Sequence, residues 1–429
     1  MRNRILPLLM APVLLALPAM GASTITILNN DAAGVGLNDP TPVAPVGSNP
    51  ATTLGAQRLY ALQHAVNIWA AKLDSSVTIT VRASFQPLTC NATQAVLGSA
   101  GALTVHGNFT GAPFFNTWYS QALANKLFGS DLDAATPDIQ ARFNSNLGSA
   151  GCLDGSFFYL GTDSSIPGGQ VDFVVVAIHE LAHGLGFQTF TSGSTGALLA
   201  GFPSVWDHFL FDATTGLTWN NSSAAQRIAS AVSVDKLVWN GTNVNGSANQ
   251  VLNAGPNFKL TAPAAIASNN TEVGTAAFGP PLNTTGLLGE IMPVVAQPAS
   301  IGPACEALNA INTLAVNGKI ALIDRGGCSF VIKVKNAQNA GAIGVVIANN
   351  VAGVLNMTGT DPTITIPSLM ISQSAGNALK TALLTRSRTR SGVFARLLLD
   401  PAVRLGTDAL GRVKMYAPST FAGGSSVSH

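Results

Sequence analysis

Two histidines and a glutamate occur within five residues, in the run His179-Glu180-Leu181-Ala182-His183. Residues four apart on an α-helix lie one turn apart on the same face, so both imidazoles can bind one metal ion. Glu180 lies beside them, where its carboxylate can take a proton from a water at the metal. Because ionisable groups on an otherwise apolar helix are costly without a metal, the pattern predicts a hydrolytic zinc site. His179 and His183 are the predicted ligands, and Glu180 is the predicted general base.

A catalytic zinc ion needs a third protein ligand and one open position. The other histidines of the chain are His64, His106, His208 and His429. The first falls on a predicted amphipathic helix and the second in a glycine-rich loop, so both are expected to be structural or at the surface. His208 and His429 stay open as third ligands, because spacing alone does not rank them. Glu272 and Glu290 are acidic alternatives that would make a different class of zinc site.

The helix that carries the motif is predicted over residues 171–185, where the sequence is strongly apolar. Upstream, apolar residues recur every three or four positions over 59–73, which predicts an amphipathic helix with Thr53 as its N-cap. Alternation at 77–81 and the aromatic run at 157–160 predict strands. This order of helices and strands indicates an α+β domain.

A second domain is predicted further along, because the composition changes near residue 255. Short apolar runs at 320–323 and 344–348 predict buried strands, and periodic patterns predict helices over 329–340 and about 372–384. Together they predict a βαβ-like unit with its own core. A cluster of arginines follows, which we interpret as a solvated connector: Arg386, Arg388 and Arg390.

The charge balance excludes several partners. Only 10% of the residues are charged, and 22 basic against 20 acidic side chains give a net charge of +2. This balance provides no basic patch for nucleic acid and no polybasic arm for a membrane. Apolar runs after residue 22 are interrupted before they reach the ~18–20 residues of a membrane-spanning helix. We expect no nucleic-acid partner and no stable membrane insertion, and the sequence predicts no oligomeric state.

The first 21 residues predict export. Arg2 and Arg4 precede an apolar stretch, and Ala19-Met20-Gly21 places small residues at the cleavage offsets. A cleaved signal peptide over 1–21 implies a secreted protein, extracellular or periplasmic, in which cysteines pair. The predicted disulfides are those that keep each pair inside one predicted domain, Cys90–Cys152 and Cys305–Cys328.

Two sets of motifs resemble known families. The run from His179 to Phe187 resembles the zinc helix of leishmanolysin-like metzincins, and Gly424 to His429 resembles the segment that carries their third histidine. Asp324 to Phe330, with Lys333 and Asn336-Ala337 after it, resembles a protease-associated (PA) domain. The chain after the signal peptide therefore resembles exported bacterial zinc peptidases with an inserted PA domain.

The resemblance implies an α+β fold with three segments. These are the first part of a zincin- or metzincin-like catalytic domain at 22–256, an inserted α/β PA domain at 257–400, and a return to the catalytic domain at 401–429. It also implies a secreted zinc endopeptidase acting on protein or peptide substrates, with Zn²⁺ held by His179, His183 and His429. The alternative is a catalytically inactive zincin scaffold whose PA domain binds proteins, although the intact Glu180 speaks against it.

The chain departs from the metzincin pattern in two places. Short metzincin motifs carry the third histidine three residues after the glycine that ends the helix, but Thr189 stands at that position. Metzincins also carry a methionine-containing turn after the third histidine, whereas nothing follows His429. We therefore expect the natural chain to continue beyond this residue.

Overall fold

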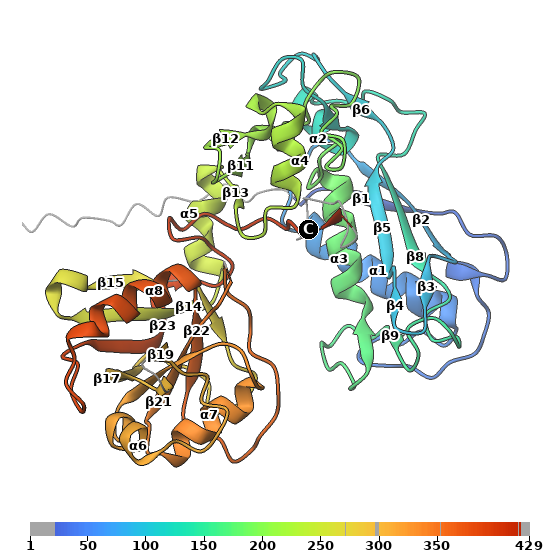
Figure 1. The fold of residues 1–429 in the computed structure, drawn as a ribbon. Helices are drawn as coiled ribbons and strands as arrows, with labels where there is room; N and C mark the ends of the chain where they lie inside the picture. Colours follow the sequence, from blue (N-terminus) through green and yellow to red (C-terminus); the bar gives the residue numbers. More distant parts are fainter. Residues whose placement is uncertain (1–21, 271, 297–299, 352, 419, 422–429) are drawn as a thin grey trace, which may run out of the picture. The chain divides into compact units, whose positions relative to one another are not determined.

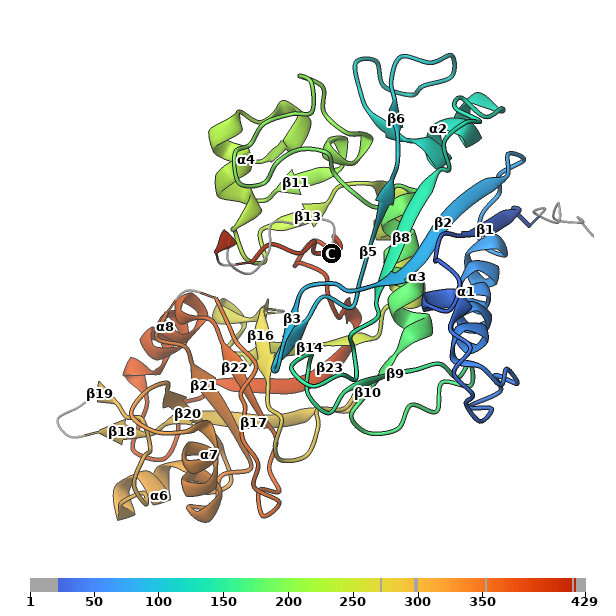
Figure 2. The same cartoon turned by 90° about the vertical axis from the view of Figure 1, so that its right-hand side faces the viewer.

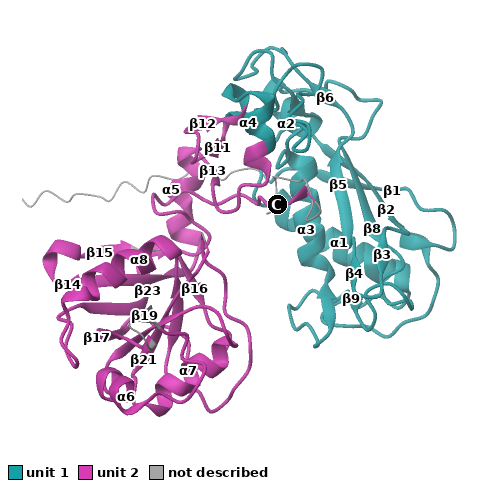
Figure 3. Ribbon diagram, viewed as in Figure 1, with its two compact units in different colours: residues 1–208, 220–228, 425–429 teal, residues 209–219, 229–424 magenta. Residues whose placement is uncertain are grey.

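The computed structural model describes residues 22–270, 272–296, 300–351, 353–418 and 420–421. The predicted signal peptide and His429 lie outside the described residues. Two compact units make up the described chain (Figures 1 and 3). The first contains the residues up to His208 together with Asn220–Ile228, and the second contains Phe209–Trp219 and the chain from Ala229 onward.

The first unit is built on a four-stranded sheet with the order β1-β2-β8-β5. Its strands are β1 (Ile25–Asn29), β2 (Ile79–Gln86), β8 (Ile139–Asn144) and β5 (Gly98–Ala102). β1, β2 and β8 run parallel, whereas β5 pairs antiparallel with β8 at the edge. Alternate apolar residues of β2 and β8 are buried, because successive side chains of a strand point to opposite faces.

Two helices pack on the apolar face of this sheet (Figure 2), namely α1 (Leu54–Ala70) and α3 (Phe173–Leu185). The predicted cap of α1 is confirmed, since the Thr53 side chain accepts a hydrogen bond from the amide of Ala56. Four phenylalanines fill the core between α3 and the strands: Phe85, Phe143, Phe158 and Phe173. The apolar side of α3 is thereby fixed in the core, which sets where its ionisable residues lie.

Shorter elements complete the first unit. They are η1 (Gly36–Asn38), β3 (Cys90–Asn91), β4 (Gln94–Ala95), β6 (Val105–His106), β7 (Tyr119–Ser120), α2 (Gln121–Phe128), β9 (Phe157–Tyr159), β10 (Gln170–Asp172) and η2 (Val205–His208). Two further elements, η3 (Trp219–Asn221) and α4 (Ala224–Ala231), contain the points where the chain passes between the units.

An eight-stranded mixed sheet forms the centre of the second unit, with the order β15-β14-β23-β17-β20-β21-β22-β16. Its strands are β14 (Ala254–Ala262), β15 (Ser268–Asn270), β16 (Val273–Thr275), β17 (Leu287–Pro293), β20 (Ile320–Asp324), β21 (Gly344–Ala348), β22 (Ser368–Ile371) and β23 (Phe394–Arg404). The predicted buried strands correspond to β20 and β21, in which nearly every residue is buried. Burial on both faces explains why they read as continuous apolar runs.

Helices lie on both sides of this sheet (Figure 1). The helical elements are α5 (Thr242–Val251), η4 (Ala264–Ile266), α6 (Ala310–Val316), α7 (Phe330–Asn339), α8 (Gln373–Ala382) and η5 (Leu383–Thr385). α7 and α8 match the predicted helices. The remaining strands are β11 (Leu210–Asp212), β12 (Leu217–Thr218), β13 (Leu237–Trp239), β18 (Val295–Ala296) and β19 (Ser300–Ile301).

The two ends of the segment predicted as the PA domain lie side by side. β14 and β23 pair antiparallel, with Pro256 opposite Leu399 and Asn257 opposite Leu398. Outside this pair, the amide of Trp239 donates to Val413 and the amide of Met415 donates to Leu237. The chain therefore leaves β13 and returns beside it after β23. In the compact units the segments 209–219 and 229–256 group with the eight-stranded sheet, so this division differs from the predicted boundary at 256.

Both predicted disulfides are confirmed. Cys90 is bonded to Cys152 in the first unit and Cys305 to Cys328 in the second. Paired cysteines are typical of proteins from oxidising compartments. Among the described residues, no helix is both long and apolar enough to cross a membrane.

Candidate metal centre

α3 carries the motif and is held at both ends. The Asp172 side chain accepts a hydrogen bond from the amide of Val175 at 3.2 Å and caps the first turn. At the other end Gly186 has φ +128°, a value that residues other than glycine rarely adopt. The chain turns away from the helix axis there. The helix therefore ends at Leu185, two residues after His183.

The two histidines converge. Their Nε2 atoms are 3.2 Å apart, and the rings meet edge to face with centroids 4.8 Å apart. Two nitrogens bound to one tetrahedral zinc ion at ~2.0–2.1 Å lie ~3.3 Å from each other. The observed separation therefore fits a shared zinc ion.

The other nitrogen of His183 fixes the ring. Nδ1 lies 2.7 Å from the backbone carbonyl oxygen of Phe187, and an N–H there donates to it. This arrangement leaves Nε2 as the nitrogen able to bind a metal, which is the usual division of roles in zinc-bound histidine. Burial, together with the neighbouring His183, lowers the pKa of His179. A lowered pKa favours the neutral imidazole, which is the form that binds metal.

Glu180 is buried against the edge strand β5. Its side chain is 8% exposed, and a Cβ at Gly98 would lie 2.8 Å from its Cγ, so glycine makes room for the carboxylate. Burial raises the pKa of Glu180 to about 7, while a hydrogen bond from the Ala100 amide acts in the opposite direction. A carboxylate that titrates near neutral pH suits a group that must accept and return a proton. A metal ion next to it would lower this pKa by its positive charge.

None of the described residues joins His179 and His183 as a third metal ligand. His429 lies outside them. Within the described ranges, no three His, Cys, Asp or Glu side chains form a group able to hold a metal ion. Instead, His208 stacks on Phe114 with ring centroids 4.0 Å apart, and its Nε2 lies 3.0 Å from the Thr117 hydroxyl. The His208 ring is thus engaged by Phe114 and Thr117, and it does not form a metal-binding group with the two motif histidines.

The acidic alternatives have other surroundings. Glu290 forms an ion pair with Lys319 and accepts hydrogen bonds from the amides of Ser391 and Gly392. These contacts hold its pKa below the ordinary value although burial opposes them. Glu272 lines a cavity in the second unit together with Asp235 and Lys236. The motif residues brought together are therefore His179, Glu180 and His183.

Two features of the site were not expected from sequence. The strand that packs against Glu180 is β5, whereas the predicted strand at 157–160 pairs with β10. β5 consists of Gly-Ser-Ala-Gly-Ala, which lacks the β-branched and aromatic residues that mark strands. The second feature is Asp207, a fully buried carboxylate.

Asp207 anchors the loop that follows α3. It accepts hydrogen bonds from the hydroxyls of Thr189 at 2.6 Å and Thr191 at 2.5 Å. It also accepts one from the amide of Ser204 at 2.8 Å. Thr189, which stands where short metzincin motifs have a histidine, is thus held by Asp207. The same loop supplies the Phe187 carbonyl that orients His183.

Asp207→Asn is expected to weaken zinc binding and the fold together. The amide group replaces one acceptor by a donor, so at least one of the three hydrogen bonds is lost at a cost of about 1–3 kcal/mol of unfolding free energy. The Phe187 carbonyl becomes less well fixed, and zinc affinity falls by about tenfold, the range for outer contacts of metal ligands. A competition titration with a chromogenic chelator measures this. Asp212→Asn is the matched control, because Asp212 is a buried carboxylate of the second unit; equal losses of affinity in both variants would contradict the assignment.

Comparison with known proteins assigns the middle of the chain. Residues 290–379 match the family model of the PA domain. This segment is a PA domain. It includes the end of β17, the strands β20, β21 and β22 and the helices α6 and α7, and it contains the Cys305–Cys328 disulfide.

Curated relatives match over short stretches. Signal peptide peptidase-like 4 of Oryza sativa subsp. japonica is 34% identical over 152 residues, 31% of this chain and 25% of that protein. Vacuolar-sorting receptor 5 of Arabidopsis thaliana is 40% identical over 88 residues, 18% of this chain and 14% of that protein. The chain thus spans a quarter or less of the length of these two relatives. Their names include both a peptidase-like protein and a receptor.

Among solved structures, an aminopeptidase from Aneurinibacillus sp. strain AM-1 shares 25% sequence identity with a TM-score of 0.26. The match covers 35% of this chain and 32% of that one.

Proposed function

We propose that this protein is a secreted zinc-dependent endopeptidase of the metzincin type that carries an inserted PA domain. The observation that carries the proposal is the pair of Nε2 atoms 3.2 Å apart beside a buried glutamate. His179 and His183 hold the metal, and His429 is proposed as the third ligand. The two disulfides and the predicted signal peptide support export.

Bound zinc supplies Lewis acidity toward the scissile carbonyl and lowers the pKa of water. The protein residues do the remaining work. Glu180 accepts a proton from the attacking water on a carboxylate oxygen, and it then delivers that proton to the leaving amine. The packing of Glu180 on Gly98 and the hydrogen bond from Ala100 hold this carboxylate in one place. Phe187, through its carbonyl, keeps His183 in the tautomer that binds metal.

Casein hydrolysis by the purified protein tests the proposal. We expect hydrolysis that stops with a zinc chelator and returns on addition of zinc, but is insensitive to a serine-protease inhibitor. Cleavage of a peptide with an acetylated N-terminus identifies an endopeptidase, since an aminopeptidase needs a free amine. Zinc-loaded protein that cleaves neither substrate would instead support the inactive scaffold.

We also propose that residues 257–400 are an insertion. The parts of the chain before and after this segment pair directly with each other. Support comes from the pairing of Leu237 and Trp239 with residues 413–415 on the far side of the segment. Asn257 also donates a hydrogen bond to Asp400, so the two ends of the segment meet.

Replacing 257–400 by a short Gly-Ser linker is therefore expected to leave a protein that unfolds cooperatively and still binds one zinc ion. The reason is that the apolar core of the first unit and the disulfide Cys90–Cys152 contain no residue of this segment. Circular dichroism melting and zinc titration measure the outcome. As the reciprocal control, 257–400 expressed alone is expected to fold with its own disulfide. Loss of cooperative unfolding in the deletion variant would refute the insertion.

A further inference from the structure

The arginine cluster expected to be a simple connector has a defined conformation. It lies in the loop between η5 and β23, where the amide of Ser387 donates to the carbonyl of Arg390 at 2.8 Å. The Ser387 hydroxyl in turn accepts a hydrogen bond from the amide of Arg390 at 2.9 Å. The loop is therefore a closed turn that presents Arg386 and Arg388 at fixed positions.

None of the three arginines has an acidic partner among the described residues. In the same unit, Glu290, Asp324 and Asp400 are each paired with a lysine. Arg386 donates one hydrogen bond from its guanidinium to the carbonyl of Leu383, and its other N–H groups can bind a ligand. The loop thus carries positive charge that the described chain does not neutralise.

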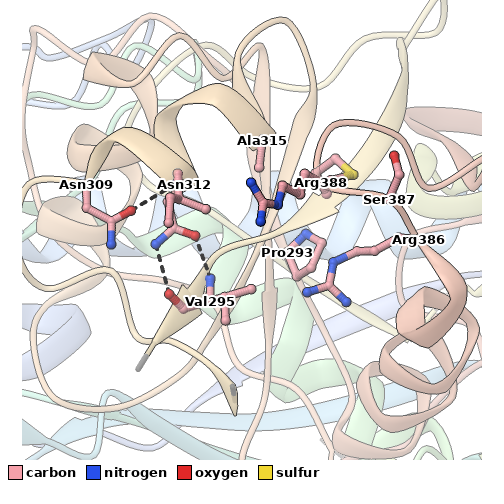
Figure 4. A pocket seen from close by; sticks show the side chains of 10 residues that line it. Pro293, Val295, Asn309, Asn312, Ala315, Arg386, Ser387 and Arg388 are labelled. Carbon is pink, nitrogen blue, oxygen red and sulfur yellow. Dashed lines mark hydrogen bonds between the residues drawn. The ribbon is translucent and has the colours of Figure 1, made fainter. Parts of the chain in front are cut away.

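A cavity of about 270 Å³ opens beside this loop. It lies at the carboxyl end of β17, between α6 and the arginines (Figure 4). Half of the residues that line it are apolar, and the others are two asparagines, a serine and two arginines, with no acidic side chain: Met292, Pro293, Val295, Asn309, Ile311, Asn312, Ala315, Arg386, Ser387 and Arg388. The guanidinium groups of Arg386 and Arg388 lie near Pro293 in this view.

The polar groups in the wall differ in what they can still bind. Asn312 is held by Val295, since its Oδ1 accepts from the amide of Val295 and its Nδ2 donates to the carbonyl of the same residue, each at 2.8 Å. Asn309 uses its side-chain oxygen to cap α6, which leaves its amide N–H groups as donors. The charged groups of the wall, Arg386 and Arg388, are donors only, and no acidic side chain lines the cavity beside them.

The apolar part of the wall continues onto the surface. Ile311 and Leu314 on α6 are each 61% exposed. A cavity of ~150 Å³ is large enough to hold benzene, so this one can hold an aliphatic side chain. The combination of an apolar floor with cationic donors selects a ligand that has an aliphatic group next to a carboxylate. Carboxylates match the planar fork of arginine through paired hydrogen bonds.

We propose that this pocket of the PA domain binds an acidic peptide segment of another protein. An aliphatic side chain of the segment enters the cavity beside Ile311, and an adjacent aspartate or glutamate pairs with Arg386 and Arg388. The proposal does not depend on the zinc site.

Fluorescence anisotropy with the whole protein tests this. The probes are a labelled peptide of alternating leucine and aspartate or glutamate, and its counterpart with asparagine and glutamine; a chelator in the buffer prevents hydrolysis by the proposed zinc site. The acidic peptide is expected to bind, and the amide counterpart to bind at least about tenfold more weakly, since hydrogen bonds between charged groups are the strong ones. High salt weakens the binding.

Variants of the loop separate specific pairing from general attraction. Arg388→Gln is expected to weaken binding by about tenfold. Arg390→Gln is the matched control, because it removes the same charge from the same turn but does not line the cavity; its effect is expected to stay below about threefold. Ile311→Ser, at an exposed position that leaves the fold intact, is expected to weaken binding through the apolar contact.

Three outcomes would overturn the proposal. These are equal losses from Arg388→Gln and Arg390→Gln, equal binding of the acidic and amide peptides, and binding of phosphatidylserine vesicles in the absence of peptide binding. The last result would assign the arginines to a membrane surface. Thermal melting of each variant shows whether it is folded. If an arginine variant does not fold, Ile311→Ser still tests the proposal.

Discussion

Glu180→Gln is expected to lower the rate of peptide hydrolysis by about 10²–10⁴-fold while zinc remains bound. Glutamine has the shape of glutamate, so it fits against Gly98 and can still accept the hydrogen bond from Ala100. It cannot accept the proton of the attacking water, because the amide is not basic. The rate falls for a chemical reason while the fold and the metal site are kept.

The measurements are casein hydrolysis and zinc stoichiometry on the same preparation. Because burial disfavours the charged form of Glu180, the neutral glutamine is expected to leave thermal stability unchanged or raised. Glu306→Gln is a suitable control, since Glu306 is an exposed residue of the second unit. Hydrolysis at a near-normal rate in Glu180→Gln would show that Glu180 is not the general base.

The local part of the site could be predicted from sequence because it depends on one helix. The spacing of His179 and His183 fixes their relation to each other once a helix forms, and the apolar residues between 173 and 185 identify the helix. The convergence of the two Nε2 atoms follows from this geometry. The β20 and β21 strands were predictable for a similar reason, since burial on both faces requires continuous apolar runs.

The non-local part could not be predicted. β5 is built from small residues with no strand pattern, and only its pairing with β8 makes it a strand. The burial of Glu180, and with it the raised pKa, depends on Gly98, which is 82 residues earlier in the sequence. Asp207 likewise acts through threonines 16 and 18 residues away. Such contacts leave no periodic signal.

The same limit applies to the arginine loop. Its sequence, Ser387-Arg388-Thr389-Arg390, is that of an exposed connector and has neither helical nor strand periodicity. The cavity beside it arises because β23 returns antiparallel to β17 and thereby brings the loop to the end of that strand. Leu287 pairs with Leu397, about 110 positions further along the chain, and no local sequence pattern predicts such a pairing.

Removing a zinc ligand is expected to have the second large effect. His183→Ala deletes a nitrogen that lies 3.2 Å from its partner and is oriented by the Phe187 carbonyl. The loss of a direct ligand exceeds the loss of an outer contact, so zinc affinity is expected to fall by more than about 10²-fold, and hydrolysis with it. Competition with a chelator of known affinity measures the change at constant pH, because the ligands must be unprotonated to bind.

The same titration identifies the third ligand. His429→Ala is expected to lose zinc as His183→Ala does, whereas His208→Gln is expected to keep it, because His208 is engaged by Phe114 and Thr117. Glu290→Gln is also expected to keep zinc, since its carboxylate is held by Lys319 and two backbone amides. Thermal melting separates a lost ligand from a damaged fold in each variant. If His208→Gln, Glu272→Gln or Glu290→Gln abolished zinc binding while His429→Ala did not, the metzincin assignment would fail at its third ligand, although the pair on α3 would still bind metal.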